Sequence, residues 1–221
     1  MQRLFEIRST ARRPEKRRLL PIAWLVLTAG LAISAVAQKA RQQFYIKPDQ
    51  RADLHEPKLV TAKQDCANWG LAAGLETMLA QQKVALDQNF WVMHLNYGEL
   101  CADLPSIEHL TKVVNQEFVL DDGRHVRLEL RFTPIASAIV DDVLAPLKRD
   151  QASLMLWRGH PYFLVGATYD ERIGRDGTRF FDIKELRLAD TFAKQPAVTF
   201  QKNRETVGEL DGILNVSVTE R

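Results

Sequence analysis

The N-terminal part of the chain contains one long apolar run, from Leu19 to Ala37. It has 19 residues and no charged side chain. A helix of that length, at about 1.5 Å per residue, roughly matches the ~30 Å hydrocarbon core of a bilayer, and the run lacks the polar face that a buried core helix usually keeps. We therefore expect a membrane segment. Ala35-Val36-Ala37 also fits a cleavage site before Gln38, so a permanent anchor and a cleaved signal peptide are both open; the length of the run favours the anchor.

After this run the apolar positions follow a helical period first and a strand period later. Residues 38–63 are polar and charged and are expected to form a linker, which places the domain at residues 64–221. The expected helices cover residues 69–82, with Asp65 or Asn68 as cap, a segment after Pro105 with Ser106 as cap, and residues 135–148. The expected strands cover residues 118–120 and 125–132, joined by an Asp-Gly turn, and residues 153–157, 162–169, 179–188 and 213–218. Helices followed by antiparallel strands predict an α+β fold.

Charge divides the chain into two parts. Residues 1–18 hold seven Arg or Lys and two Glu, and such a tail stays in the cytoplasm, so the domain is expected on the extracytoplasmic side, periplasmic or outer. Of the 30 basic and 28 acidic residues, 23 and 26 remain beyond the tail. A domain this close to neutral lacks the basic surface of a nucleic-acid-binding protein. The histidines show no metal-ligand spacing, and we expect no metal and no cofactor.

Two neighbourhoods carry residue types suited to catalysis. In the first, Gln64 and Cys66 precede the first expected helix; in the second, His160 opens an apolar strand and Asp190 follows the next strand. A thiol at a helix N-terminus is activated by the helix dipole and by a nearby imidazolium. A histidine base needs a third group to fix its tautomer, and a glutamine amide can bind an oxyanion. Each residue alone also has a structural interpretation, but their order points to thiol nucleophilic catalysis.

The two cysteines of the chain, Cys66 and Cys101, allow a second interpretation. In an oxidising compartment such a pair is a candidate disulfide, and in a reducing one it is two thiols. Which of the two applies decides whether Cys66 is available as a nucleophile.

In this order of residues the sequence resembles the papain-like cysteine peptidases, particularly the compact bacterial branch that includes effector-type and bacteriocin-processing peptidases. The resemblance covers residues 64–190. It implies an α+β fold in which a helical half packs against an antiparallel sheet, with a peptide-binding cleft between them. For an active member it also implies that Cys66 attacks, that His160 acts as general base and acid, that Asp190 orients the imidazole and that Gln64 assists the oxyanion. With glycine at the nucleophile position, His160 and Asp190 are remnants.

The resemblance allows two registers. In the family the oxyanion glutamine lies six residues before the nucleophile, and compact members read Asn-Trp-Cys-Trp-Ala-Ala at the helix start. Six residues after Gln64 is Gly70, in the local sequence Asn-Trp-Gly-Leu-Ala-Ala, and a glycine cannot attack a carbonyl. In the other register Cys66 attacks, only two residues after Gln64. Several larger family members have a cystine that begins just before the nucleophile, and Cys66 with Cys101 resembles it, so the first register explains both cysteines.

These observations predict a membrane-tethered, extracytoplasmic domain of papain-like fold that binds a peptide or protein segment. The favoured hypothesis is a pseudopeptidase with Gly70 at the nucleophile position. The first alternative is an active thiol peptidase that uses Cys66, His160 and Asp190. The second is a structural accessory domain of an envelope assembly.

Overall fold

A computed structural model describes residues 45–221, except residue 56 and residues 97–98, 138–139, 195–197 and 203–207. The basic tail and the expected membrane segment, residues 1–18 and 19–37, lie outside the described residues. No helix in the described part of the chain is long and apolar enough to cross a membrane. All the described residues belong to one unit of the chain, which runs from Gln43 to Arg221.

The expected α+β fold is confirmed. The helices are α1 (Ala67–Ala80), α2 (Gln88–Leu95), α3 (Ile107–Val114), the short 3-10 helix η1 (Ile135–Ser137) and α4 (Val140–Lys148). The strands are β1 (Tyr45–Asp53), β2 (Glu117–Val119), β3 (His125–Pro134), β4 (Ser153–Trp157), β5 (His160–Ile173), β6 (Arg179–Asp190), β7 (Val198–Lys202) and β8 (Leu210–Glu220). Most of the helices therefore precede most of the strands, as predicted.

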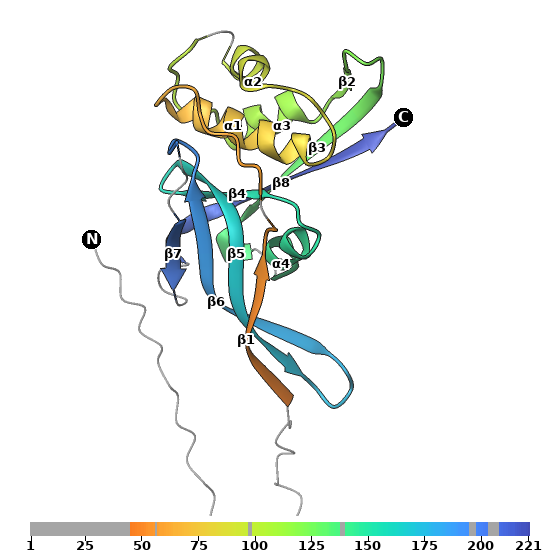
Figure 1. Ribbon diagram of the computed structural model, residues 1–221, viewed down its shortest axis with the longest axis vertical. Helices are drawn as coiled ribbons and strands as arrows, with labels where there is room; N and C mark the ends of the chain where they lie inside the picture. The colour runs from red at the N-terminus through yellow and green to blue at the C-terminus, as the bar shows by residue number, and fades with distance from the viewer. Residues whose placement is uncertain (1–44, 56, 97–98, 138–139, 195–197, 203–207) are drawn as a thin grey trace, which may run out of the picture. The chain divides into compact units, whose positions relative to one another are not determined.

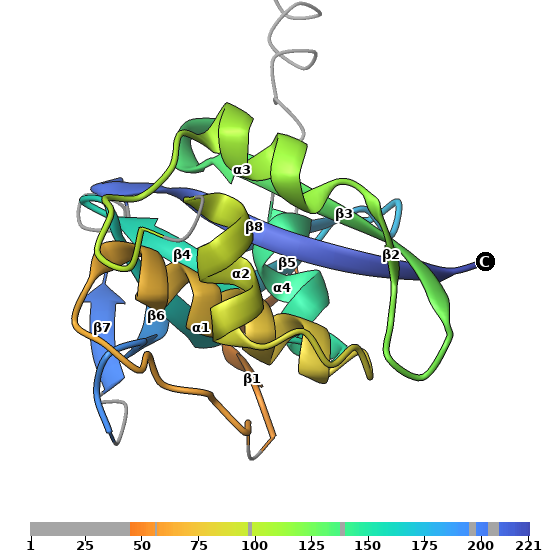
Figure 2. The ribbon, with the colours of Figure 1, turned by 90° about the horizontal axis from the view of Figure 1, so that it is seen from above.

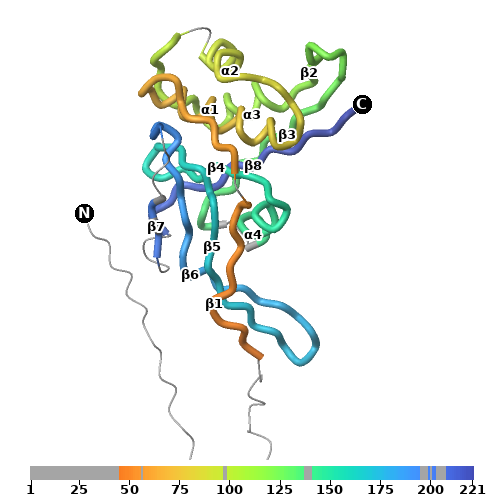
Figure 3. The backbone as a smooth tube through the Cα atoms, in the orientation of Figure 1, coloured from red at the N-terminus to blue at the C-terminus, as the bar shows by residue number. Residues whose placement is uncertain are grey.

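The strands form one antiparallel sheet with the order β2-β3-β8-β4-β5-β6-β7, and β1 pairs with β5. Strand β5 has 14 residues and pairs with β6 along one edge. Its other edge is shared, because β4 pairs with residues 160–164 and β1 with residues 166–173. Beyond the end of β4, the β5–β6 ribbon is accompanied by β1 (Figures 1 and 3).

Helices cover both faces of the centre of the sheet. Four consecutive residues of β4 are buried, which requires a cover on each face. Helix α1 provides one cover, and its Gly74 lies so close to the sheet that an added Cβ would be 2.2 Å from Leu154 Cδ1. Helix α4 provides the other, where Asn215 of β8 donates to the carbonyl of Asp142 at 3.2 Å (Figure 1). Helices α2 and α3 extend the layer of α1 (Figure 2).

The segment expected to be a linker is in part a strand, which corrects the domain start near Gln64. Residues 45–53 form β1 and pair with β5. The alternation of this strand is interrupted by a shift of register between Lys47 and Gln50. It also contains Pro48, which an edge strand tolerates because it need not donate to a second neighbour. A sequence this polar therefore gave no strand pattern.

Two further elements, α2 and β7, are absent from the sequence-based expectation. Helix α2 has only eight residues, too few for a clear helical period, and it is capped by Asp87, which accepts from Phe90 N at 2.9 Å.

Helix α1 begins one residue after Cys66, which occupies the N-cap without a side-chain hydrogen bond. The expectation that Asp65 or Asn68 caps this helix is wrong.

Candidate functional site

His160 and Asp190 meet at one end of the β5–β6 ribbon. His160 is the first residue of β5 and Asp190 the last of β6, and these antiparallel strands place Tyr162 opposite Asp190. His160 Nε2 lies 3.0 Å from Asp190 Oδ1. A carboxylate only accepts hydrogen bonds, so Nε2 is the donor in this pair. The same Oδ1 accepts from Phe192 N at 2.9 Å, which holds the carboxylate in place.

Aromatic side chains surround this pair. The ring centroids of Tyr162 and Phe192 lie 4.5 and 5.0 Å from that of His160, and Trp157 lies 5.7 Å from Tyr162. We call His160, Asp190, Trp157, Tyr162 and Phe192 the His160 cluster. The side chains of His160 and Asp190 are 32% and 35% exposed, so a ligand can reach them. Burial raises the pKa of the Tyr162 hydroxyl and the charge of Asp190 raises it further, which keeps this hydroxyl a neutral donor.

Gly70 of α1 packs directly against the residues that flank the histidine and the aspartate. An added Cβ at this position would lie 2.7 Å from Thr191 Oγ1, 2.9 Å from Phe192 Cζ and 2.9 Å from Pro161 Cγ. Thr191 is fully buried, and its hydroxyl donates to the carbonyl of Pro161 at 2.9 Å. The space that a nucleophilic side chain at position 70 would need is therefore filled by these three residues.

Cys66 is not a thiol in this structure. It is bonded to Cys101, with the two sulfurs 2.02 Å apart, which confirms the expected disulfide. Two hydrogen bonds reinforce this connection between the first turn of α1 and the segment before Cys101: Trp69 Nε1 donates to the carbonyl of Leu100 at 2.6 Å, and Asn68 Nδ2 to that of Glu99 at 3.3 Å. The alternative in which Cys66 attacks a substrate therefore lacks its nucleophile.

Gln64 lies beside this cystine. Its Oε1 is 4.0 Å from Cys66 Sγ and 3.8 Å from Cys101 Sγ, and the residue is exposed. Within the described part of the chain no hydrogen bond joins Gln64 to His160 or Asp190. Its expected role at an oxyanion stays a prediction, because an oxyanion forms only on a bound substrate.

The structure adds residues that the sequence analysis did not single out. Pro161, Thr191 and Phe192 close the space next to Gly70, and Trp157 and Tyr162 line the histidine. All five lie within three residues of His160 or Asp190 in the chain, so their position was the only signal for them. No three His, Cys, Asp or Glu side chains form a metal-binding group among the described residues.

Comparison of the chain with protein-family models, with curated proteins and with solved structures gives no match. A family for this chain therefore rests on its own residues and geometry.

Proposed function

We propose that the chain is a membrane-tethered, extracytoplasmic pseudopeptidase of papain-like fold, which binds a peptide or protein segment and does not cleave it. The bound segment lies against the His160 cluster, at the junction between the helical layer and the sheet. The acid–histidine pair of a thiol peptidase is kept, and the nucleophile is replaced.

The observation that carries this proposal is the environment of Gly70. In the register that places the nucleophile six residues after Gln64, Gly70 occupies the nucleophile position. Its nearest neighbours are Pro161, Thr191 and Phe192. Pro161 follows His160 in the chain, and Thr191 and Phe192 follow Asp190. A glycine that met this pair by chance would not be expected to pack against both flanks of it, and this supports the register.

The surface around His160 supports binding rather than a purely structural role. A fully structural His–Asp pair needs no solvent access, whereas about a third of each side chain is exposed here. Half-buried aromatic rings next to a hydrogen-bonding pair give a site for apolar side chains and for backbone amides at once. Trp157, Tyr162 and Phe192 provide the rings.

The test is a selection for ligands on the full chain in detergent micelles, with a displayed library of random peptides as the probe. We expect a selected peptide to bind with a Kd that Tyr162→Ala or His160→Ala weakens by about tenfold, as for a residue at the centre of an interface. Phe180→Ala is the matched control, an exposed aromatic residue on β6 far along the strand from Asp190, and it should leave the Kd unchanged.

Mass spectrometry of the peptide after long incubation decides between binding and hydrolysis. The proposal expects intact peptide. Cleavage that disappears in His160→Ala would restore the peptidase hypothesis. A library that yields no binder, or binders that Tyr162→Ala does not affect, would overturn the binding function and favour the structural accessory domain.

A further inference from the structure

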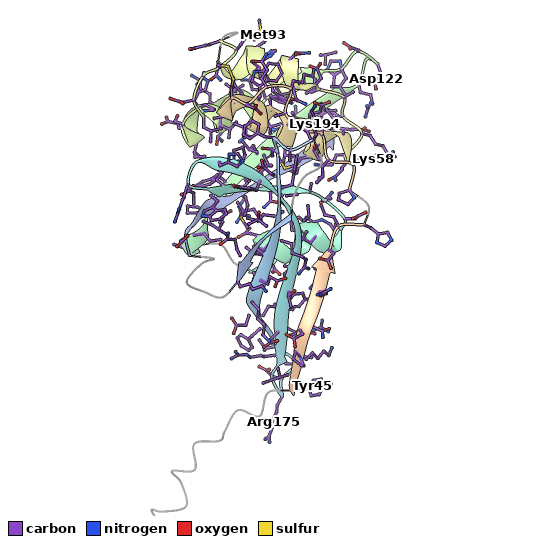
Figure 4. The ribbon with its side chains drawn as sticks, turned by 60° about the vertical axis from the view of Figure 1, so that its left-hand side comes forward. Tyr45, Lys58, Met93, Asp122, Arg175 and Lys194 are labelled. Carbon is purple, nitrogen blue, oxygen red and sulfur yellow. A yellow bond between two sulfur atoms is a disulfide. The ribbon has the colours of Figure 1, made fainter. Side chains whose placement is uncertain are left out.

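The far end of the β5–β6 ribbon carries exposed apolar side chains. Figure 4 shows Tyr45 and Arg175 together at this end, and Met93 and Asp122 at the opposite end of the described unit. Tyr45, Ile46 and Phe180 are 65%, 50% and 51% exposed. Water-soluble domains rarely leave several large apolar side chains exposed in one region of the surface. We call Tyr45, Ile46, Phe180 and the turn around Arg175 the ribbon tip.

The register places these side chains on both faces of the tip. Ile46 pairs with Arg172, and Arg172 pairs with Phe180, so one rung across three strands carries an apolar residue at each side of an arginine. Tyr45 is opposite Ile173 on the next rung, and neighbouring rungs point to opposite faces. Apolar side chains on both faces fit insertion of the tip end-on, not the docking of one face on a flat partner.

Tyr45, in the ribbon tip, is also the described residue that lies nearest in sequence to the expected membrane segment. Seven residues separate Ala37 from Tyr45. An extended chain covers at most about 3.5 Å per residue, so this connection reaches at most about 28 Å. A membrane segment that ends at Ala37 thus keeps Tyr45 within that distance of the bilayer surface.

We propose that the ribbon tip inserts into the interface of the lipid bilayer that holds residues 19–37. Tyr45 then lies at the headgroup level, where tyrosine and tryptophan are enriched, and Ile46 and Phe180 reach the headgroup–acyl boundary. This inference uses the tether of the proposed function but not its peptide binding, so the two can fail separately.

The cations on the strands of the tip are paired with carboxylates, and the turn adds one cation and one anion, Arg175 and Asp176, so the contact is mainly apolar. Arg172 pairs with Asp182 at 2.9 Å, and Arg179 and Lys47 both pair with Glu171, at 3.2 and 3.3 Å. Cations that are already paired add little attraction to anionic lipid. The contact is therefore expected in zwitterionic bilayers as well as in anionic ones.

A measurement of the depth of the ribbon tip in a bilayer tests the proposed insertion. The full chain, with its disulfide kept, carries one added cysteine labelled with an environment-sensitive fluorophore, either Arg175→Cys at the tip or Met93→Cys at the helical end, and is reconstituted into dioleoylphosphatidylcholine vesicles. Spin-labelled lipid with its nitroxide at headgroup depth quenches the fluorophore on contact. We expect about twofold quenching or more at position 175, as for a group at the headgroup–acyl boundary, and none at position 93.

Two variant pairs show which side chains are responsible. Ile46→Ser with Phe180→Ser should abolish the quenching at position 175. Leu100→Ser with Val119→Ser, which removes two exposed apolar residues (53% and 66% exposed) at the helical end, should preserve it. Absence of quenching at 175, equal quenching at 93, quenching that survives the first pair, or failure of the chain to float with the vesicles would overturn the proposal. The comparison of positions 175 and 93 stands even if a serine variant does not fold.

Discussion

At position 70 the missing side chain is as informative as the residues that are present. Glycine in the middle of a helix usually costs about 1 kcal/mol relative to alanine, and α1 is otherwise well packed, with 11 of its residues buried. The close approach of Pro161, Thr191 and Phe192 gives the reason that glycine stands here. The same approach that leaves no room for a larger side chain at position 70 lets α1 lie against the ends of β5 and β6.

Replacement of Gly70 by alanine should therefore destabilise the domain, although alanine has the higher helix propensity. Gly70→Ala is expected to lower the free energy of unfolding by about 1 kcal/mol, because overpacking of about 1–3 kcal/mol exceeds the gain in propensity. Urea denaturation measures this. Phe192→Ala in the same chain should recover part of the loss, since the Phe192 ring is one of the groups displaced. A Gly70→Ala chain that is more stable than the wild type would contradict the packing.

Tyr162 gives the site a pH dependence on the alkaline side. Burial first, and the charge of Asp190 second, raise its pKa. An acidic group whose pKa is raised on folding favours the folded state fully at pH values below its unfolded pKa of about 10. This stabilisation is lost as the pH rises through the folded pKa. The wild type should thus lose more stability than Tyr162→Phe between about pH 9 and about pH 11. Urea midpoints across this range measure it; equal losses would exclude the effect.

Among the elements, the start of α1 depends on the Cys66–Cys101 disulfide. The bond closes a sequence separation of 35 residues, for which chain entropy predicts a stabilisation of about 3–4 kcal/mol. Reduction should lower the free energy of unfolding by that amount in urea denaturation. A chain with Cys66→Ala and Cys101→Ala should show the same loss without reductant and no further loss with it. A reduced chain as stable as the oxidised one would contradict this role.

The attachment of β1 to the ribbon depends on Gly166. Asp53, Gly166 and Arg187 lie on one rung across β1, β5 and β6, and Arg187 Nε donates to Asp53 Oδ1 at 2.9 Å over the central strand. An added Cβ would lie 2.7 Å from Arg187 Nε. Gly166→Ala should therefore increase amide hydrogen exchange in β1 and destabilise by about 1–3 kcal/mol. Asp53→Ala should reduce that penalty; unchanged exchange would show that the ion pair does not hold β1.

The sequence predicted those elements in which local chemistry and tertiary packing agree. Ser106 caps α3 by accepting from His109 N at 3.2 Å, the Asp-Gly turn joins β2 and β3, and β4 has the expected bounds. Strand β1 could not be found from its pattern, because its order comes from pairing with β5 and not from an apolar face. Its burial on folding is slight at most of its positions.

The sequence likewise predicted only some of the residues of the candidate site. His160 and Asp190 were found because their spacing in the chain fits two neighbouring antiparallel strands, and they do hydrogen bond. Phe192 and Thr191 could not be found, since their contact with Gly70 joins residues more than 100 positions apart. The role of Cys66 was open because redox state is a property of the compartment and not of the residues.

On the scale of the whole domain, the β5–β6 ribbon connects the two proposed surfaces. The His160 cluster lies at one end of β5 and the ribbon tip at the other, from His160 to Ile173. A strand of that length rises by about 40 Å. With the tip in the bilayer interface, the ribbon would hold the proposed peptide-binding surface about that far from the membrane.

Alkylation of the full chain, purified from the membranes of cells that export it, shows whether the site holds a free thiol. The chain is unfolded without reductant, treated with iodoacetamide and weighed intact by mass spectrometry. Because the only two cysteines are Cys66 and Cys101, a site without a nucleophilic thiol should gain no alkyl group before reduction and two afterwards. One or two alkyl groups before reduction would show a free thiol beside α1 and would overturn the proposal that the site lacks a nucleophile.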